Sequence, residues 1–170
     1  MYVAKREAGL VKKVNQDSVL IQYVKYKNKE ALLAIVCDGV GGLAQGEFAS
    51  ASIVYGFSEW MQESVLKQDG YAIQKSLEER LKIWNEKLYL YAKEHHISMA
   101  TTCSLLFLWN GEYILVHVGD SYIYEIQKDG LHQLTTDQSY NHVLLQSIGY
   151  NSHVTMQGKE VEFNRINFIQ

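Results

Sequence analysis

The sequence predicts an α+β fold with antiparallel sheets and helices packed outside them. Three observations carry this prediction: two apolar strand-like segments near the start, two amphipathic helices after them, and a second half rich in short strands joined by turns. Strands and helices that are segregated along the chain are typical of this class. No linker or repeat interrupts the order, so we expect a single domain over residues 1–170.

The first two strands are predicted at residues 19–24 and 31–37. Both segments are apolar and β-rich, and the charged segment 25–30 separates them, so an antiparallel hairpin is the simplest arrangement. Asp17 comes before the first strand and Asp38 follows the second. Antiparallel pairing therefore places these two acids side by side at one end of the hairpin.

Two helices are predicted next. Apolar residues recur at helical spacing from Gly46 to about Glu63 and again from Ile73 to Ala92, where charged residues occupy the opposite face. Aromatic residues in these stripes, such as Trp60 and Trp84, are most simply explained as core packing.

The second half of the chain is predicted to be a β meander. Asn110-Gly111 and Asp129-Gly130 separate alternating segments, and such pairs are the strongest short-range hairpin signals. The predicted strands cover residues 101–109, 113–118, 121–126 and 131–134.

Composition excludes several classes of function. A net charge of -3 and a pI of about 6.1 provide no basic surface for nucleic acid or an anionic membrane. No apolar run reaches the roughly 18 residues of a membrane span, and the first residues lack the apolar core of a signal peptide, so a cytoplasmic protein is predicted.

Cys37 and Cys103 lie in apolar segments and are predicted core residues. The adjacent His95 and His96 cannot share a helix face, which disfavours zinc.

The segment 31–50 contains the strongest candidate for a metal ligand. An apolar strand ends at Asp38, glycines follow at 39, 41 and 42, and a helix begins near Gly46. A carboxylate at the end of a buried strand needs a partner, and a hard divalent cation suits it. The glycines allow the backbone to turn tightly and approach such an ion. An ordinary Asp-Gly turn between strand and helix would also explain the segment.

Another acid interrupts the meander. Asp120 follows Gly119 in an otherwise apolar segment, where a polar break indicates a bulge directed at a ligand or a neighbouring charge. An aspartate that caps a loop is the alternative. Taken together, Asp17, Asp38 and Asp120 are the oxygen donors that a polynuclear site for Mg²⁺ or Mn²⁺ requires.

Five sequence elements occur in a fixed order between residues 15 and 139. They are Asn15-Gln16-Asp17-Ser18; Asp38-Gly39-Val40-Gly41-Gly42 with Gly46-Glu47-Phe48-Ala49-Ser50; Ala100-Thr101-Thr102; Val118-Gly119-Asp120-Ser121; and Leu134-Thr135-Thr136-Asp137-Gln138-Ser139. In this order they resemble the motifs of the metal-dependent serine/threonine protein phosphatases of type 2C, the PPM family. A nucleotide-binding loop is disfavoured because no Gly-Lys-Ser/Thr follows the glycines.

The resemblance implies a PPM-type sandwich of two antiparallel β-sheets flanked by helices. It also implies hydrolysis of phosphoserine or phosphothreonine in a phosphorylated protein substrate, by hydroxide bound to two Mg²⁺ or Mn²⁺ ions. In the family pattern Asp38 bridges both ions, the Gly39 carbonyl binds one, Asp17 holds metal-bound waters and Asp120 helps a third ion. Lys12 stands at the position of the arginine that meets the substrate phosphate, and it lacks the bidentate fork of arginine.

The chain also departs from the family pattern. Tyr122 stands where the family often has an arginine, and Gln138 replaces the usual histidine. Asp137 is the last aspartate, whereas the family supplies two later metal-binding aspartates. We therefore expect a sandwich that is incomplete at the carboxyl end and an impaired phosphatase; the alternative is a non-catalytic phosphatase-like domain that binds a partner or phosphopeptide. An unfinished sandwich would leave an open sheet edge, which predicts some self-association.

Overall fold

The computed structural model describes residues 5, 7, 14–40, 43, 45–62, 64–109, 111–141 and 143–162. A five-stranded sheet with the strand order β1-β2-β3-β4-β9 lies at its centre. The strands are β1 (Ser18–Tyr26), β2 (Lys29–Cys37), β3 (Cys103–Trp109), β4 (Glu112–Val118) and β9 (Gln157–Glu162). Every neighbouring pair is antiparallel, as the sequence predicted.

The predicted first hairpin is confirmed. β1 and β2 pair from Ser18 opposite Cys37 to Tyr26 opposite Lys29. The two-residue connection begins with Lys27, whose φ of 54° is of the kind that two-residue hairpin turns favour. The strands extend beyond the predicted ranges into the charged segment, because ladder pairing needs only backbone groups while these side chains stay exposed to water.

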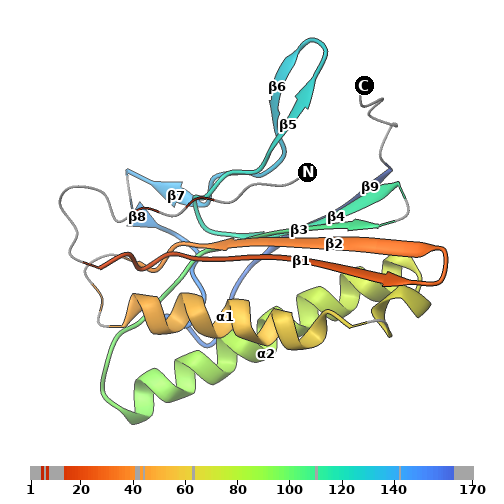
Figure 1. Cartoon of the computed structure of the whole chain (residues 1–170). Helices are drawn as coiled ribbons and strands as arrows, with labels where there is room; N and C mark the ends of the chain where they lie inside the picture. The colour runs from red at the N-terminus through yellow and green to blue at the C-terminus, as the bar shows by residue number, and fades with distance from the viewer. Residues whose placement is uncertain are drawn as a thin grey trace.

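Both predicted helices are present and lie against one face of the central sheet (Figure 1). They are α1 (Gly46–Trp60) and α2 (Gly70–Glu94), with a short 3₁₀ turn, η1 (Val65–Lys67), between them. α1 ends earlier than the predicted boundary near residue 63, because Met61 leaves the helical backbone conformation with a ψ of 85°. α2 begins at a capped end, where the Asp69 carboxylate accepts a 2.8 Å hydrogen bond from the N–H of Ala72.

The core fills the space between the sheet and the helices. The apolar stripes of both helices are buried in it, as predicted, and its fully buried helix residues include Ile53, Phe57, Ile73, Leu77 and Leu81. The helices pack closely at Gly56, where any Cβ would overlap the Trp84 indole. Cys37 and Cys103 are free, fully buried thiols in this core, which confirms the prediction. Burial raises the pKa of the Cys37 thiol well above its ordinary value.

Two small sheets lie on the side of the central sheet that faces away from the helices (Figure 1). β5 (Tyr124–Gln127) pairs with β6 (Gly130–Gln133), and β7 (Ser139–Tyr140) pairs with β8 (Val143–Leu144). The sequence predicted that the strands at 121–126 and 131–134 continue the meander. They form a separate hairpin instead, because Gly119 has a φ of 116° and turns the chain out of the sheet after β4. β9 takes the place beside β4.

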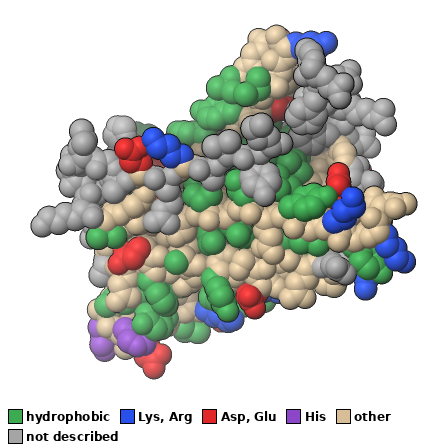
Figure 2. Space-filling view, viewed as in Figure 1, with side chains coloured by type: hydrophobic (Ala, Val, Ile, Leu, Met, Phe, Trp, Pro, Cys, Tyr) green, Lys and Arg blue, Asp and Glu red, His purple; other side chains and the backbone are tan. Residues whose placement is uncertain are grey.

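The α+β class with antiparallel sheets and two helices is confirmed. Among the described residues, the second layer of the predicted sandwich consists of the two small sheets. Hydrophobic side chains are exposed on the β5–β6 hairpin (Figure 2), where Ile126 is 78% and Leu131 is 63% accessible. No helix in the described ranges is long and apolar enough to cross a membrane.

Candidate functional site

Asp17 and Asp38 lie beside each other at one rim of the central sheet. Ser18 and Cys37 form the terminal pair of the β1–β2 ladder, and the two acids are the next residues outward on each strand. Asp38 is an exposed residue and Asp17 is half-buried. The hairpin geometry expected from the sequence therefore places both acids at one rim.

Asp120 lies at the same rim. It follows β4 by two residues, and Val118 at the end of β4 pairs with Cys103 at the start of β3. The start of β3 lies beside the end of β2 in the β2–β3 register. The turns that carry Asp17, Asp38 and Asp120 therefore all lie at the same end of strands β1 to β4.

The backbone around Asp38 is held by the start of β3. The Asp38 N–H donates to Thr102 Oγ1 at 2.9 Å, and its carbonyl accepts from the Thr102 N–H at 2.9 Å and from the Thr101 hydroxyl at 3.0 Å. The next residue, Gly39, donates its N–H to the Gln16 carbonyl at 3.1 Å. These bonds fix the main chain from which the Asp38 carboxylate projects.

The glycines at this turn permit a close approach to α1. A Cβ on Gly39 would lie 2.6 Å from the Gln16 carbonyl oxygen and 2.6 Å from the backbone of Gly46. Any other residue would have to push the first turn of α1 away. Gly39 is therefore needed for a close approach to Gln16 and α1, whereas the approach of the glycine backbone to an ion stays a prediction. Gly41 and Gly42 lie outside the described residues.

The polar residues around Asp17 connect it to α1. The Ser50 hydroxyl donates to the Gln16 carbonyl at 2.6 Å and lies 3.0 Å from the Ser18 hydroxyl. The Gln16 side chain donates to Glu47 in the first turn of α1 at 3.1 Å. The pKa of Glu47 is lowered, first by a hydrogen bond with its own backbone and then by Gln16. Both neighbours of Asp17 are thereby anchored to one helix.

Thr102 connects the Asp38 turn to the Asp120 turn. Its Oγ1, which accepts from the Asp38 N–H, lies 3.0 Å from the hydroxyl of Ser121. A Cβ on Gly119 would lie 2.6 Å from the Thr102 methyl group, so a glycine is required there by both space and φ. The two acid-bearing turns therefore share one threonine as a common support.

His117 lies fully buried beneath the Asp120 turn. Its Nδ1 is 2.9 Å from Ser104 Oγ and its Nε2 is 2.9 Å from the Gly119 carbonyl. Burial lowers the pKa of His117 because the protonated ring would lose its hydration. The imidazole is consequently neutral near pH 7.

Tyr122 occupies the position where the family resemblance expects arginine. Its hydroxyl donates to Asp137 at 2.8 Å, which raises the pKa of Tyr122. The pKa of Asp137 is lowered, first by its hydrogen bond with Ser139 and next by Tyr122. Asp137 is thus engaged with Tyr122 and Ser139, and an arginine charge at position 122 is not needed to hold it.

The chemistry of the donors at this rim fits a hard divalent cation. The three aspartates and the Gly39 carbonyl offer only oxygen atoms, which Mg²⁺ and Mn²⁺ prefer. In the described part of the chain, no three His, Cys, Asp or Glu side chains gather into a group that could hold a metal ion. An ion held at this rim would therefore complete its coordination with water, as Mg²⁺ commonly does. Lys12, the predicted phosphate ligand, lies outside the described residues.

Sequence reasoning identified the acids and missed most of the residues that support them. The supporting residues are Gln16, Ser50, Thr102, His117 and Gln138. Four of the five belong to the motifs that carry the family resemblance, so their polar character within those motifs was the available signal. His117 offered only a weaker signal, as a histidine in an otherwise apolar strand.

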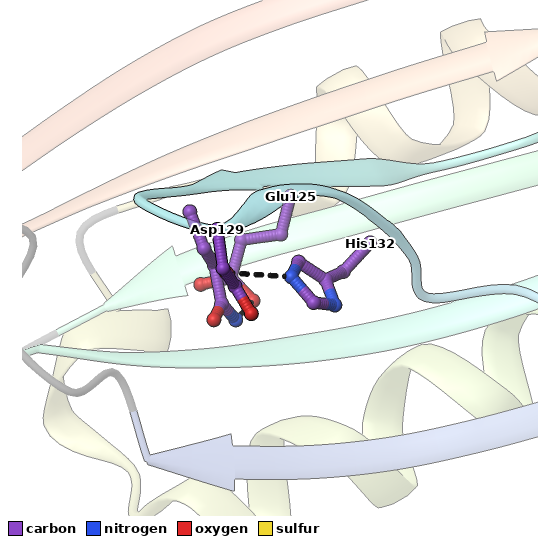
Figure 3. Close-up of polar contacts among 4 residues, drawn as sticks. Glu125, Asp129 and His132 are labelled. Atoms are coloured by element: carbon purple, nitrogen blue, oxygen red, sulfur yellow. Dashed lines mark hydrogen bonds and ion pairs between the residues drawn. The ribbon is translucent and has the colours of Figure 1, made fainter.

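The β5–β6 hairpin carries a separate polar cluster. His132 Nε2 lies 2.9 Å from the Asp129 carboxylate, and Glu125 pairs opposite His132 in the ladder (Figure 3). The hydrogen bond from His132 lowers the pKa of Asp129. Like the rest of the described chain, the hairpin brings together no three His, Cys, Asp or Glu side chains that could hold a metal ion.

A pocket of ≈ 380 Å³ lies between α2 and residues 152–154. None of the rim acids lines it. Asn85, which does, donates to the carbonyls of Asn151 and Ser152 and accepts from the N–H of Gly149 at 2.8 Å. Its amide is fully used in closing the loop, so the rim remains the better candidate for chemistry.

Comparison with protein-family models supports the resemblance. A model described as protein phosphatase 2C matches residues 10–164. A serine/threonine phosphatase, stp, of Listeria innocua is 28% identical over 144 residues, which cover 83% of this chain and 56% of that protein. The protein phosphatase PhpP of Streptococcus pneumoniae is 28% identical over 138 residues, covering 80% of this chain and 54% of that protein. The chain thus spans about half the length of these curated relatives.

Solved structures share the fold. The serine/threonine phosphatase Stp1 of Staphylococcus aureus superposes with a TM-score of 0.83 at 23% identity, over 94% of this chain and 70% of that one. The Mycobacterium tuberculosis phosphatase PstP/Ppp gives a TM-score of 0.73 at 23% identity, over 95% of this chain and 74% of that one. At this level of identity the likeness establishes the arrangement of strands and helices.

Proposed function

We propose, because the chain belongs to the protein phosphatase 2C family, that it carries out metal-dependent hydrolysis of phosphoserine and phosphothreonine in proteins. The observation that carries the proposal is the position of Asp17, Asp38 and Asp120, the three acids of the family motifs, at one rim of the sheet. The named phosphatases among the relatives support the same activity, and since the chain spans about half their length, the activity of the whole protein is part of the proposal.

The rim residues would hold Mg²⁺ or Mn²⁺. Asp38 and the Gly39 carbonyl would hold the ions directly, Asp17 would act through water and Asp120 would contribute to a further, weaker ion. A bound ion of this kind activates water and neutralises charge that develops on the phosphoryl group. Lys12 would bind the substrate phosphate as a point charge and orient it less strictly than an arginine does.

The proposed partner is a phosphorylated protein in the cytoplasm. Nucleic acid is not a proposed partner, because the net charge is -3 and the described acidic and basic side chains are interspersed on the face seen in Figure 2.

We also propose weak self-association through an edge of the central sheet, where β1 is the outermost strand. A mass by light scattering that stays monomeric at high concentration would contradict it.

The test is Mn²⁺-dependent hydrolysis of p-nitrophenyl phosphate and of a phosphothreonine peptide. Asp38→Asn removes the carboxylate charge and keeps the shape, so turnover should fall about 100-fold or more, since metal stabilisation of the transition state is worth several kcal/mol. Asp69→Asn is the matched control: it makes the same chemical change at the start of α2, away from the rim, and should leave turnover unchanged.

Two outcomes would contradict the proposal. One is turnover in Asp38→Asn equal to that of the unaltered chain. The other is an absence of turnover at saturating Mn²⁺ while the phosphopeptide still binds, which would identify the alternative, a non-catalytic phosphatase-like domain.

A further inference from the structure

Three hydrogen bonds hold the backbone of Gly119, in addition to its unusual φ. Its N–H donates to Gln138 Oε1 at 2.9 Å, and its carbonyl accepts from the Gln138 N–H at 2.9 Å. The same carbonyl lies 2.9 Å from His117 Nε2. Gln138 therefore holds both backbone polar groups of Gly119, and His117 holds the carbonyl as well, immediately before Asp120.

The chemistry of the partners assigns the hydrogen atoms. A carbonyl oxygen can only accept, so Nε2 of His117 must carry the proton that it shares with Gly119. The Nδ1 of the neutral ring then accepts from the Ser104 hydroxyl, 2.9 Å away. Because the ring is fully buried, neither nitrogen has water as a substitute partner. The ring is thereby held in one tautomer and one orientation.

We propose that Gln138 and His117 are positioning residues that aim the Asp120 carboxylate at the rim, acting through the backbone of Gly119. The proposal rests on the proposed function, in which Asp120 contributes to ion binding. Gln138 stands where the family motif has a histidine. Its side chain accepts from the Gly119 N–H and donates to the Thr155 carbonyl at 3.3 Å, and a neutral imidazole offers the same combination of one acceptor and one donor.

A competing explanation is that Gln138 only anchors the segment before β9, since it contacts Thr155. A nearby residue separates the two roles. Gln146 Oε1 accepts a 2.9 Å hydrogen bond from the N–H of Thr155 and has no hydrogen bond to Gly119 among the contacts found for the described residues. Gln138→Met and Gln146→Met therefore make the same chemical change and remove the same type of side-chain acceptor, but only the first releases Gly119.

The experiment measures Mn²⁺ binding by calorimetry, without substrate, in a double-mutant cycle. Gln138→Met should weaken the Asp120-dependent binding on the order of 10-fold, the usual loss when an outer partner of a metal ligand is removed. In an Asp120→Asn background the same substitution should change the affinity by less than about twofold. Gln146→Met should leave the affinity unchanged. Gln138→His should retain the affinity at pH values above the pKa of the introduced imidazole, because the neutral ring can accept from the Gly119 N–H.

A second measurement needs no variant. The Gly119 amide should exchange with solvent far more slowly than the amide of Gly111, an exposed turn glycine, because it donates to Gln138. Equally fast exchange of the two amides would overturn the proposal even if Gln138→Met did not fold.

Three further results would overturn the positioning proposal. The first is an unchanged Mn²⁺ affinity in folded Gln138→Met, and the second is a loss of affinity that is equally large in the Asp120→Asn background. The third is Mn²⁺ binding by the unaltered chain that does not depend on Asp120. Binding through Asp120 that responds to Gln138 without any phosphate hydrolysis would support the positioning role and reject the proposed function alone.

Discussion

The turn that carries Asp38 and the turn that carries Asp120 lie at the same rim, but different kinds of contact hold them. The Asp38 turn is held mainly by main-chain bonds, such as those from the Gly39 N–H to the Gln16 carbonyl and from the Val40 N–H to the Ala100 carbonyl. The Asp120 turn has one main-chain bond, from the Gln138 N–H to the Gly119 carbonyl, and otherwise depends on the side chains of His117 and Gln138, which reach Gly119.

This difference determines which substitutions each turn tolerates. Main-chain bonds survive most changes of side chain, so, apart from the hydroxyls of Thr101 and Thr102, the Asp38 turn should be sensitive chiefly to added atoms that push the backbone apart. Side-chain bonds are lost one residue at a time, so the Asp120 turn should respond to single replacements of its polar supports. Stability and pH measurements can separate the two cases.

Gly39→Ala should have the largest effect on stability. The new Cβ would lie 2.6 Å from backbone atoms of Gln16 and Gly46, which cannot rotate away, so we expect a loss of about 3 kcal/mol in the free energy of unfolding. Urea titration measures it. Gly111→Ala is the control for backbone conformation alone: with a φ of 81° and no atom within 4 Å, it should cost about 1 kcal/mol. Equal losses would refute the close-approach explanation.

His117→Phe should lower the free energy of unfolding by about 2 kcal/mol, because the buried Ser104 hydroxyl keeps only its 3.4 Å contact with the Ser121 carbonyl and the Gly119 carbonyl loses the imidazole donor. The pH dependence is a sharper measurement. Burial lowers the pKa of folded His117, so the unfolded chain binds this proton more readily. Stability is then highest above the unfolded pKa of about 6.5 and falls as the pH drops below it. In His117→Phe, the free energy of unfolding should decrease less between pH 7 and pH 5 than it does in the unaltered chain. An equal decrease would show that His117 is not its source.

Ser50→Ala tests the link between Asp17 and α1. The buried Ser50 hydroxyl donates to the Gln16 carbonyl at 2.6 Å, and its removal should cost about 1.5 kcal/mol in thermal or urea unfolding. Ser52→Ala, on the same helix, removes a 2.7 Å bond to the Phe48 carbonyl that is exposed to water. It should change stability by no more than about 0.5 kcal/mol. Similar effects of the two substitutions would argue against a special role for Ser50.

Asp69→Ala should have the smallest effect and should not alter the rim. The Asp69 carboxylate caps α2 through the Ala72 N–H, and loss of such a cap costs about 1 kcal/mol. Asp69→Asn keeps an acceptor at the same place and should recover most of that stability. Altered Mn²⁺ affinity in either variant would mean that the rim is coupled to the far end of α2, contrary to the local supports described above.

Local patterns in the sequence determined much of the fold. The β1–β2 hairpin, both amphipathic helices and the shared rim of Asp17 and Asp38 follow from hydrophobic periodicity and chain direction, because these act over a few residues. The family motifs added the acids and glycines of the rim. What each motif glycine does could not be predicted from its motif alone, because the close approach of Gly39 depends on where α1 begins.

The tertiary structure alone decided how the rim is completed. The meander breaks at Gly119, β9 takes the place beside β4, and Gln138 reaches Gly119 across 19 residues of chain. No local propensity encodes these contacts, since each requires two segments to be brought together by packing of the rest of the molecule. The sequence by itself thus determined which acids are the candidates for the chemistry, and the packed structure determined which polar side chains hold their turns in place.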